Sequence, residues 1–180
     1  RYLLMLRSDG SRRIIWSIDT AFAVHPDMKS HTGGASSFGC GALGCKSTKQ
    51  KLNGHSLTEI KVIGVDDFMP AMCWTRYFLQ AQGYAVTDNM LHQDNKSTIL
   101  LETNGKLSSG KRTKHINVRY FFITDRVNKG EVSVEWCPTG EMVADFATKP
   151  LQGTLFKRFR DLIMGVVPMN DSSTEKKQGS

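Results

Sequence analysis

The stretch of sequence that organises this chain runs from residue 13 to residue 22 and reads Arg13-Ile-Ile-Trp-Ser-Ile-Asp-Thr-Ala-Phe22. Isoleucine and aromatic residues fill it, and such a composition favours a β-strand. Asp19 falls within the span of this strand. The predicted strand therefore carries a candidate functional carboxylate.

Two short segments follow this strand, at residues 32–38 and 42–46. Gly-rich turns separate them, and such turns between short segments predict an antiparallel meander of three strands. From Ser56 the pattern becomes helical up to Gly83, with Pro70 expected to kink or interrupt the helix.

Strands and helices then alternate along the chain. Strands are predicted over 85–93 and 132–137, and helices over 96–103, over 112–127, from Glu141, and around 155–163. Three hairpin strands followed by alternating strands and helices predict an α/β fold: a mixed five-stranded sheet with helices on its faces.

The length, hydropathy and net charge of the chain limit the kinds of protein it can be and the partners it can bind. The 180 residues suit one domain, and no stretch approaches the roughly 18 apolar residues of a membrane span. Lys and Arg number 24 against 17 Asp and Glu, a net charge of +7. This charge fits a nucleic-acid partner as well as it fits a protein with surplus surface lysines.

The cysteines and tryptophans are assigned structural roles. Cys40, Cys45, Cys73 and Cys137 contain no CxxC pair, so we expect reduced, buried thiols and an intracellular protein. The three tryptophans, Trp16, Trp74 and Trp136, are expected in the core rather than as base-stacking platforms.

Three acidic residues lie at or beside predicted strand ends: Asp19, Asp94 and Asp145. Ligands gather at the carboxyl ends of strands in such sheets. Two divalent cations about 4 Å apart need several carboxylates from separate elements. The three aspartates therefore form a candidate metal cluster. Alternatively, each of them is a surface residue or a helix cap. Asp94 directly precedes a predicted helix, where Asp is a good capping residue.

Five motifs occur in one order, and together they are similar to the ribonuclease H domain of copia-type retrotransposon polyproteins. They are Asp19-Thr-Ala-Phe-Ala-Val-His-Pro-Asp-Met-Lys-Ser-His-Thr-Gly33, Lys46-Ser-Thr-Lys-Gln50, Gln93-Asp-Asn95, Arg112-Thr-Lys-His-Ile-Asn-Val-Arg-Tyr120 and Ala144-Asp-Phe-Ala-Thr-Lys-Pro-Leu151. The resemblance covers residues 1–164. It implies a ribonuclease H-like fold that cleaves the RNA strand of RNA:DNA hybrids with two Mg²⁺ ions, or Mn²⁺, during reverse transcription.

The resemblance also implies the catalytic and metal-binding set: Asp19, Asp94 and Asp145, with Glu59 as a fourth candidate. The family pattern Ser-Ser-Thr-Glu-Ala-Glu is replaced here by Ser56-Leu-Thr-Glu-Ile-Lys61, so Lys61 stands at the expected catalytic glutamate. Glu59 lies about 200° around the helix from residue 61. We expect the Lys61 ammonium to satisfy the aspartate charges in place of a metal ion.

Positive charge is concentrated between Lys106 and Lys129, where seven Lys or Arg face one acid, Asp125. Either this segment binds phosphates or it is a solvated helix face. The candidate nucleic-acid-binding residues are Lys111, Arg112, Lys114, His115 and Arg119.

The sequence thus supports three hypotheses: a hybrid-cleaving nuclease, a catalytically impaired module of the same fold that binds nucleic acid, and a scaffold that docks onto a preceding reverse transcriptase. The expected organisation is a tether over 1–13, the domain over 14–167 and a polar, disordered tail over 168–180. The expected location is intracellular, in a cytoplasmic virus-like particle or the nucleus.

Overall fold

The computed structural model of the chain describes residues 3–54, 56–104 and 114–169. The strands are β1 (Arg7–Ser8), β2 (Arg13–Ala21), β3 (His31–Ser37), β4 (Gly39–Cys40), β5 (Ala42–Lys49), β6 (Asp88–Gln93) and β7 (Ser133–Trp136). The helices are α1 (Leu57–Ala81), α2 (Lys96–Asn104), α3 (Lys114–Asn128), the 3₁₀ turn η1 (Thr139–Glu141), α4 (Asp145–Thr148) and α5 (Gly153–Ile163).

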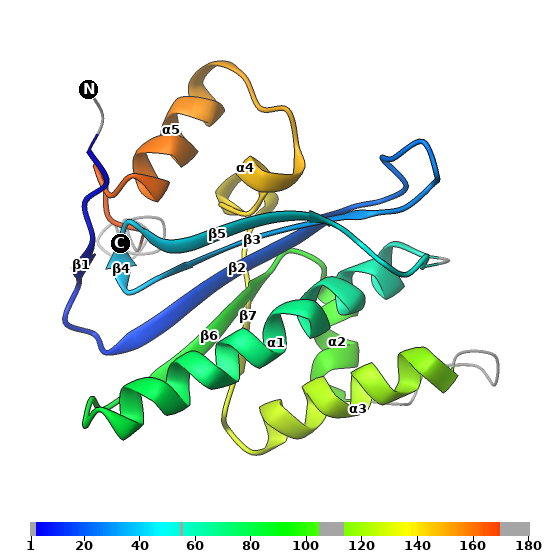
Figure 1. Cartoon of the computed structure of the whole chain (residues 1–180), viewed down its shortest axis with the longest axis horizontal. Helices are drawn as coiled ribbons and strands as arrows, with labels where there is room; N and C mark the ends of the chain where they lie inside the picture. The colour runs from blue at the N-terminus through cyan, green and yellow to red at the C-terminus, as the bar shows by residue number, and fades with distance from the viewer. Residues whose placement is uncertain (1–2, 55, 105–113, 170–180) are drawn as a thin grey trace, which may run out of the picture.

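The main sheet has five strands in the order β5-β3-β2-β6-β7. Strands β2, β3 and β5 are antiparallel neighbours, whereas β6 runs parallel to β2 and β7 parallel to β6. Helices α1 and α3 lie on one face, and α4 and α5 lie on the other (Figure 1). The predicted mixed five-stranded sheet flanked by helices is confirmed.

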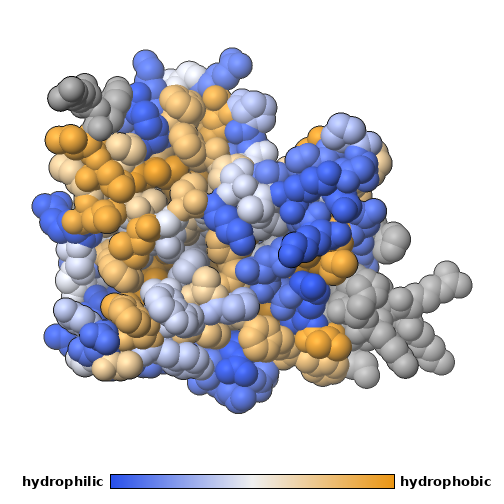
Figure 2. Space-filling model, in the orientation of Figure 1, coloured by the Kyte–Doolittle hydropathy of each residue, from blue (hydrophilic) through white to orange (hydrophobic). Residues whose placement is uncertain are grey.

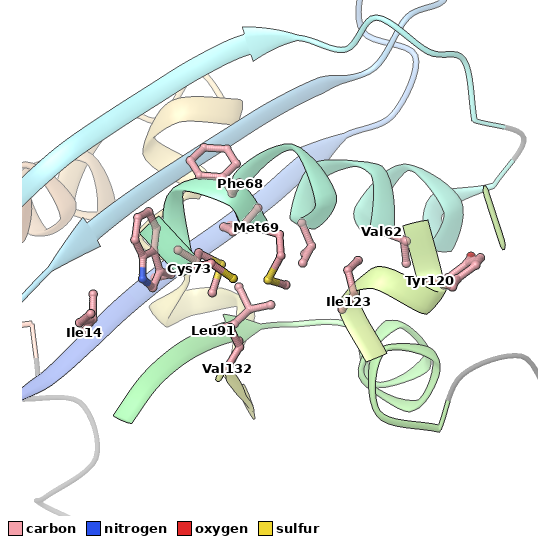
Figure 3. Close-up of a cluster of buried hydrophobic side chains, with 13 residues drawn as sticks. Ile14, Val62, Phe68, Met69, Cys73, Leu91, Tyr120, Ile123 and Val132 are labelled. Atoms are coloured by element: carbon pink, nitrogen blue, oxygen red, sulfur yellow. The ribbon is translucent and has the colours of Figure 1, made fainter. Parts of the chain in front are cut away.

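The main core lies between α1, α3 and the sheet. Leu91 of β6 and Val132 point toward Met69 and Cys73 of α1 (Figure 3). Helix α3 contributes Tyr120 and Ile123, two buried residues that are three positions apart. The 3.6-residue period of the sequence thus identified the buried helix faces.

Several details differ from the sequence-based expectations. Helix α1 continues through Pro70 as one 25-residue helix. The helix expected from Glu141 is split into η1 and the four-residue α4. Cys45 is exposed rather than buried, because it lies in the middle of β5, where consecutive residues are exposed on both faces of the strand.

The tryptophan prediction was correct only for Trp16. Trp16 is buried, and its Nε1 donates to Asn89 Oδ1 at 2.9 Å. Trp74 and Trp136 are 63% and 53% exposed, so they are not core residues. Periodicity could not separate these cases, because β7 and the second half of α1 each leave one face uncovered.

The predicted tether contacts the domain. Met5 N donates to Met164 O at 2.9 Å, and β1 pairs with β4 in a separate two-stranded sheet. At the other end, Met169 N donates to Gly39 O at 2.8 Å, whereas the rest of the expected tail, 170–180, lies outside the described residues.

On the face seen in Figure 2, apolar and hydrophilic residues gather in different regions. Apolar residues gather beside α5 and the N-terminal segment, where Leu3, Leu4, Leu6 and Val166 are at least half exposed. Hydrophilic residues gather over the β2–β3 hairpin and the start of α1. Within the part of the chain that the structure describes, no helix is long and apolar enough to span a membrane.

Candidate active site

Asp19 lies near the end of the central strand β2 and is 2% exposed. Its partner in the antiparallel ladder is Gly33 of β3. A Cβ at Gly33 would lie 2.7 Å from side-chain carbons of both Ala147 and Thr148. The absence of a side chain at residue 33 therefore lets α4 approach the sheet directly beside Asp19.

Asp94 follows β6, which is parallel to β2, so the two carboxyl ends meet at the same edge of the sheet. The Gln93 side-chain oxygen accepts from the Asp94 backbone N–H at 3.1 Å. Asn95, not Asp94, caps α2, since its Oδ1 accepts from Ser97 N at 2.9 Å. The Asp94 carboxylate is thereby available to the cluster.

Asp145 begins α4 and is 4% exposed. Burial, with a further contribution from the Asp19 charge, raises the pKa of Asp145 to about 6, although the bond to Lys149 acts in the opposite direction. The structure thus joins all three sequence-predicted aspartates, each from a different element, into one cluster through the ammonium groups of Lys61 and Lys149. Among the described residues, no group of three or more His, Cys, Asp or Glu is placed to hold a metal ion.

Lys61 of α1 reaches into this cluster. Its Nζ lies 2.8 Å from Asp19 Oδ1 and 2.6 Å from Asp94 Oδ1, and the residue is 7% exposed. Gly64 lets helix α1 lie close to the sheet. A Cβ at this position would come within 2.5 Å of Thr20 Cγ2. One ammonium therefore bridges two of the three carboxylates.

The charges around Lys61 stabilise one another. Burial acts to lower the pKa of Lys61, but Asp19 and Asp94 outweigh it and the pKa lies above its ordinary value. Burial likewise acts to raise the pKa of Asp19, but Lys61 and then Lys149 outweigh it, and that pKa lies below its ordinary value. The ionised forms of both groups are favoured.

A second ammonium, from Lys149 of the α4 region, contacts the other side of the cluster. Lys149 Nζ lies 2.7 Å from Asp145 Oδ1 and 3.7 Å from Asp19 Oδ2. Thr148 Oγ1 donates to Asp19 Oδ2 at 2.9 Å. Unlike Lys61, Lys149 has a side chain that is 40% exposed, so water competes with its ion pairs.

Glu59 lies in the first turn of α1, where its backbone N–H donates to the capping Ser56 Oγ at 3.2 Å. Burial, followed by the charges of Glu59 and Glu102, raises the pKa of Tyr120 of α3 to about 12. The structure brings Lys61, two residues further along α1, to the aspartates.

Comparisons with known proteins identify relatives by sequence and by fold, although no family model matches the chain. It is 33% identical over 137 residues to the retrovirus-related Pol polyprotein from transposon TNT 1-94 of Nicotiana tabacum, which is 76% of this chain and 10% of that protein. Its fold matches that of LC11-RNase H1, isolated from compost, with a TM-score of 0.51 at 13% identity over 74% of this chain and 91% of that one.

The chain is a ribonuclease H-type domain related to retrotransposon Pol polyproteins. A second plant relative, the Pol polyprotein from transposon RE1 of Arabidopsis thaliana, is 33% identical over 118 residues, 65% of this chain and 8% of the relative. The ribonuclease H-type domain thus spans about a tenth of the length of the curated relatives it matches.

Three polar residues of this ribonuclease H-type domain were not predicted as parts of the site: Thr148, Lys149 and Glu102. Lys149 had a sequence signal, because it lies four residues after Asp145 and such pairs meet on a helix. Glu102 had none. It is fully buried, and burial raises its pKa to about 8, although a hydrogen bond from the Gln93 side chain and the charge of Lys61 oppose the rise.

The predicted nucleic-acid-binding residues are described only in part. Lys111 and Arg112 lie outside the described residues, and Lys114 and His115 lie in the first turn of α3 without described side chains. Arg119 forms an ion pair with Asp66 of α1 and lies 3.7 Å from Asp67. Much of its charge is therefore engaged within this ribonuclease H-type domain.

Proposed function

We propose that this ribonuclease H-type domain binds RNA:DNA hybrids and that its cleavage activity is impaired. The observation that carries the proposal is the Lys61 ammonium, which bridges Asp19 and Asp94 at 2.8 and 2.6 Å. The fold supports the choice of hybrid as ligand, and the sequence relation to Pol polyproteins supports a role alongside reverse transcription.

The arrangement of the cluster does not fit the two divalent ions that the family resemblance implies. Magnesium prefers oxygen ligands in near-octahedral geometry. Here an ammonium takes one oxygen of Asp19 and one of Asp94, and its positive charge repels a cation that approaches the same oxygens. Lys61 cannot move out easily, because it is 7% exposed and its departure would take the nearest cation away from the Asp19 and Asp94 carboxylates.

A second candidate function is metal-dependent cleavage of the hybrid. The convergence of Asp19, Asp94 and Asp145 at one sheet edge favours it, since carboxylates from separate elements form such sites. The two candidates differ in what Lys61 does, so a substitution at this residue separates them.

The experiment compares the unaltered protein with Lys61→Glu and with Lys51→Glu. Lys51 is exposed in the turn after β5, so its substitution makes the same change of net charge away from the cluster. Cleavage of an end-labelled RNA:DNA hybrid is followed with and without Mg²⁺, and Mg²⁺ binding is followed by calorimetry. We expect no Mg²⁺-dependent cleavage by the unaltered protein or Lys51→Glu, and Mg²⁺ binding by Lys61→Glu.

Rapid Mg²⁺-dependent cleavage by the unaltered protein would support the second candidate and overturn the proposal. Failure of the unaltered protein to bind a blunt hybrid at low salt would overturn the hybrid-binding half. The binding half is read by fluorescence anisotropy without metal, so the two halves fail independently.

The exposed apolar residues beside α5 and the N-terminal segment indicate a protein partner. In the relatives the matching segment is part of a chain about ten times longer. We propose that the exposed Leu3, Leu4 and Leu6, beside Val166, pack against the reverse transcriptase region of such a polyprotein, because large apolar patches on a soluble surface mark contact sites.

A further inference from the structure

An exposed tryptophan stands beside the aspartate cluster. Trp136 is the last residue of β7 and pairs in parallel register with Gln93, the residue before Asp94. Its exposed fraction is 53%, although it belongs to a sheet whose neighbouring strand is buried. Cys137 N then donates to Gln93 O at 2.9 Å, which holds the backbone on the C-terminal side of Trp136.

A cation lies over the face of this indole. Lys96 Nζ is 5.4 Å from the Trp136 ring centroid, within the range of a cation–π contact. Lys96 is exposed and begins α2, two residues after Asp94. The Trp136 ring and the Lys96 ammonium thus come from two elements that adjoin Asp94 in sequence or in strand register.

This pair has the two chemical groups that an unpaired nucleotide requires. An aromatic side chain stacks on the face of a base without sequence preference, and a neighbouring lysine binds the phosphate. A base inside a duplex has both faces covered by its neighbours, so an indole stacks on a base that is unpaired. A base that takes the indole face would release the Lys96 ammonium toward the adjoining phosphate.

We propose that Trp136 and Lys96 form a stacking platform for an unpaired nucleotide in a single-stranded extension of the hybrid, next to the duplex at the aspartate cluster. The proposal rests on the hybrid binding proposed above and adds a second contact to it. The platform is rigid on the strand side, because β7 is hydrogen-bonded to β6 on the residues that precede Trp136.

The test compares Trp136→Ala with Trp74→Ala. Trp74 is a matched control, because it is 63% exposed but lies on the second half of α1 and stacks on Phe78. The probes are a 12-base-pair RNA:DNA hybrid with blunt ends and the same hybrid with a six-nucleotide thymidine extension at the 3′ or the 5′ end. Affinity is measured by fluorescence anisotropy, and circular dichroism confirms that each variant folds.

We expect one of the two extensions to strengthen binding by the unaltered protein. Trp136→Ala should lose about 5- to 150-fold in affinity for that extended hybrid, the effect of one lost stacking contact, and nothing for the blunt hybrid. Trp136→Phe should keep most of the affinity. Lys96→Ala should reduce the magnitude of the salt slope by about 0.7, the value for one single-strand phosphate.

Equal affinity of Trp136→Ala and the unaltered protein for both extended hybrids would overturn the platform, as would an equal loss in Trp74→Ala. Absence of binding to the blunt hybrid would instead overturn the proposed function. The blunt probe and the extended probes therefore report on separate statements.

Discussion

Replacement of Lys61 with methionine should destabilise the fold, because it leaves two buried carboxylates without the cation between them. Methionine keeps most of the length of the lysine side chain, so the change is chiefly the loss of the ammonium. Asp19 is 2% exposed and its Oδ1 lies 2.8 Å from Lys61 Nζ. Removal of one partner of such a buried pair costs about 3–5 kcal/mol. For a domain of this size that loss lowers the Tm by about 6–20 °C.

The pH dependence follows from the pKa shifts. Lys61 and Lys149 outweigh burial and hold the pKa of Asp19 below its ordinary value. Asp19 therefore adds stability that is present above its unfolded pKa of about 4 and is lost as the pH falls through the lower folded pKa. Lys61→Met removes the largest of the contributions that lower the Asp19 pKa, so we expect this pKa to rise in the variant and the variant to lose less stability than the unaltered protein as the pH falls. The stability difference should be largest at pH 7 and should narrow toward pH 4.

The assay is urea unfolding followed by tryptophan fluorescence at pH 7 and pH 4. Lys149→Met serves as the control, because Lys149 is 40% exposed and an ion pair of that kind contributes about 0–1 kcal/mol. A loss below about 1 kcal/mol in Lys61→Met, or a loss that grows on acidification, would refute the assigned role of the Lys61 ammonium.

Two further predictions concern the core and the basic segment. Gly34→Ala should lower the free energy of unfolding in urea by about 1–3 kcal/mol, because the added Cβ would lie 2.6 Å from the buried Phe68 ring. The control Gly44→Ala, whose added Cβ has its nearest contact at 3.7 Å, should be neutral or slightly stabilising, and equal effects of the two substitutions would contradict the packing. Arg112→Ala combined with Lys114→Ala should weaken blunt-hybrid binding and reduce the magnitude of its salt slope by about two, and an unchanged slope would exclude these residues as phosphate contacts.

Local pattern accounts for most of the fold. The run of isoleucines in β2, the Gly-rich turns after it and the apolar period of α1 and α3 each predicted an element that the structure contains. These signals are local, because strand pleat and helix pitch determine which side chains face the core over a few residues. Pro70 misled the prediction, since packing along α1 maintains the helix through it.

The candidate site was predictable only as a set of residues. Sequence motifs identified Asp19, Asp94 and Asp145 and marked Lys61 as the departure from the family pattern. The spacing of four residues between Asp145 and Lys149 is a signal for their ion pair, but nothing in the sequence indicated that Lys149 also approaches Asp19 or that Glu102 is fully buried.

The sequence by itself determined the strands, the helix faces and the chemical types of the groups in the site. The sequence also predicted that the Lys61 ammonium satisfies aspartate charges, but only the tertiary structure decided that its two partners are Asp19 and Asp94, 42 and 33 residues away along the chain. That position depends on how closely α1 and α4 approach β2, and Gly64 and Gly33 allow these approaches. The exposure of Trp136 is likewise tertiary, because whether a strand end is covered depends on elements far away in the sequence.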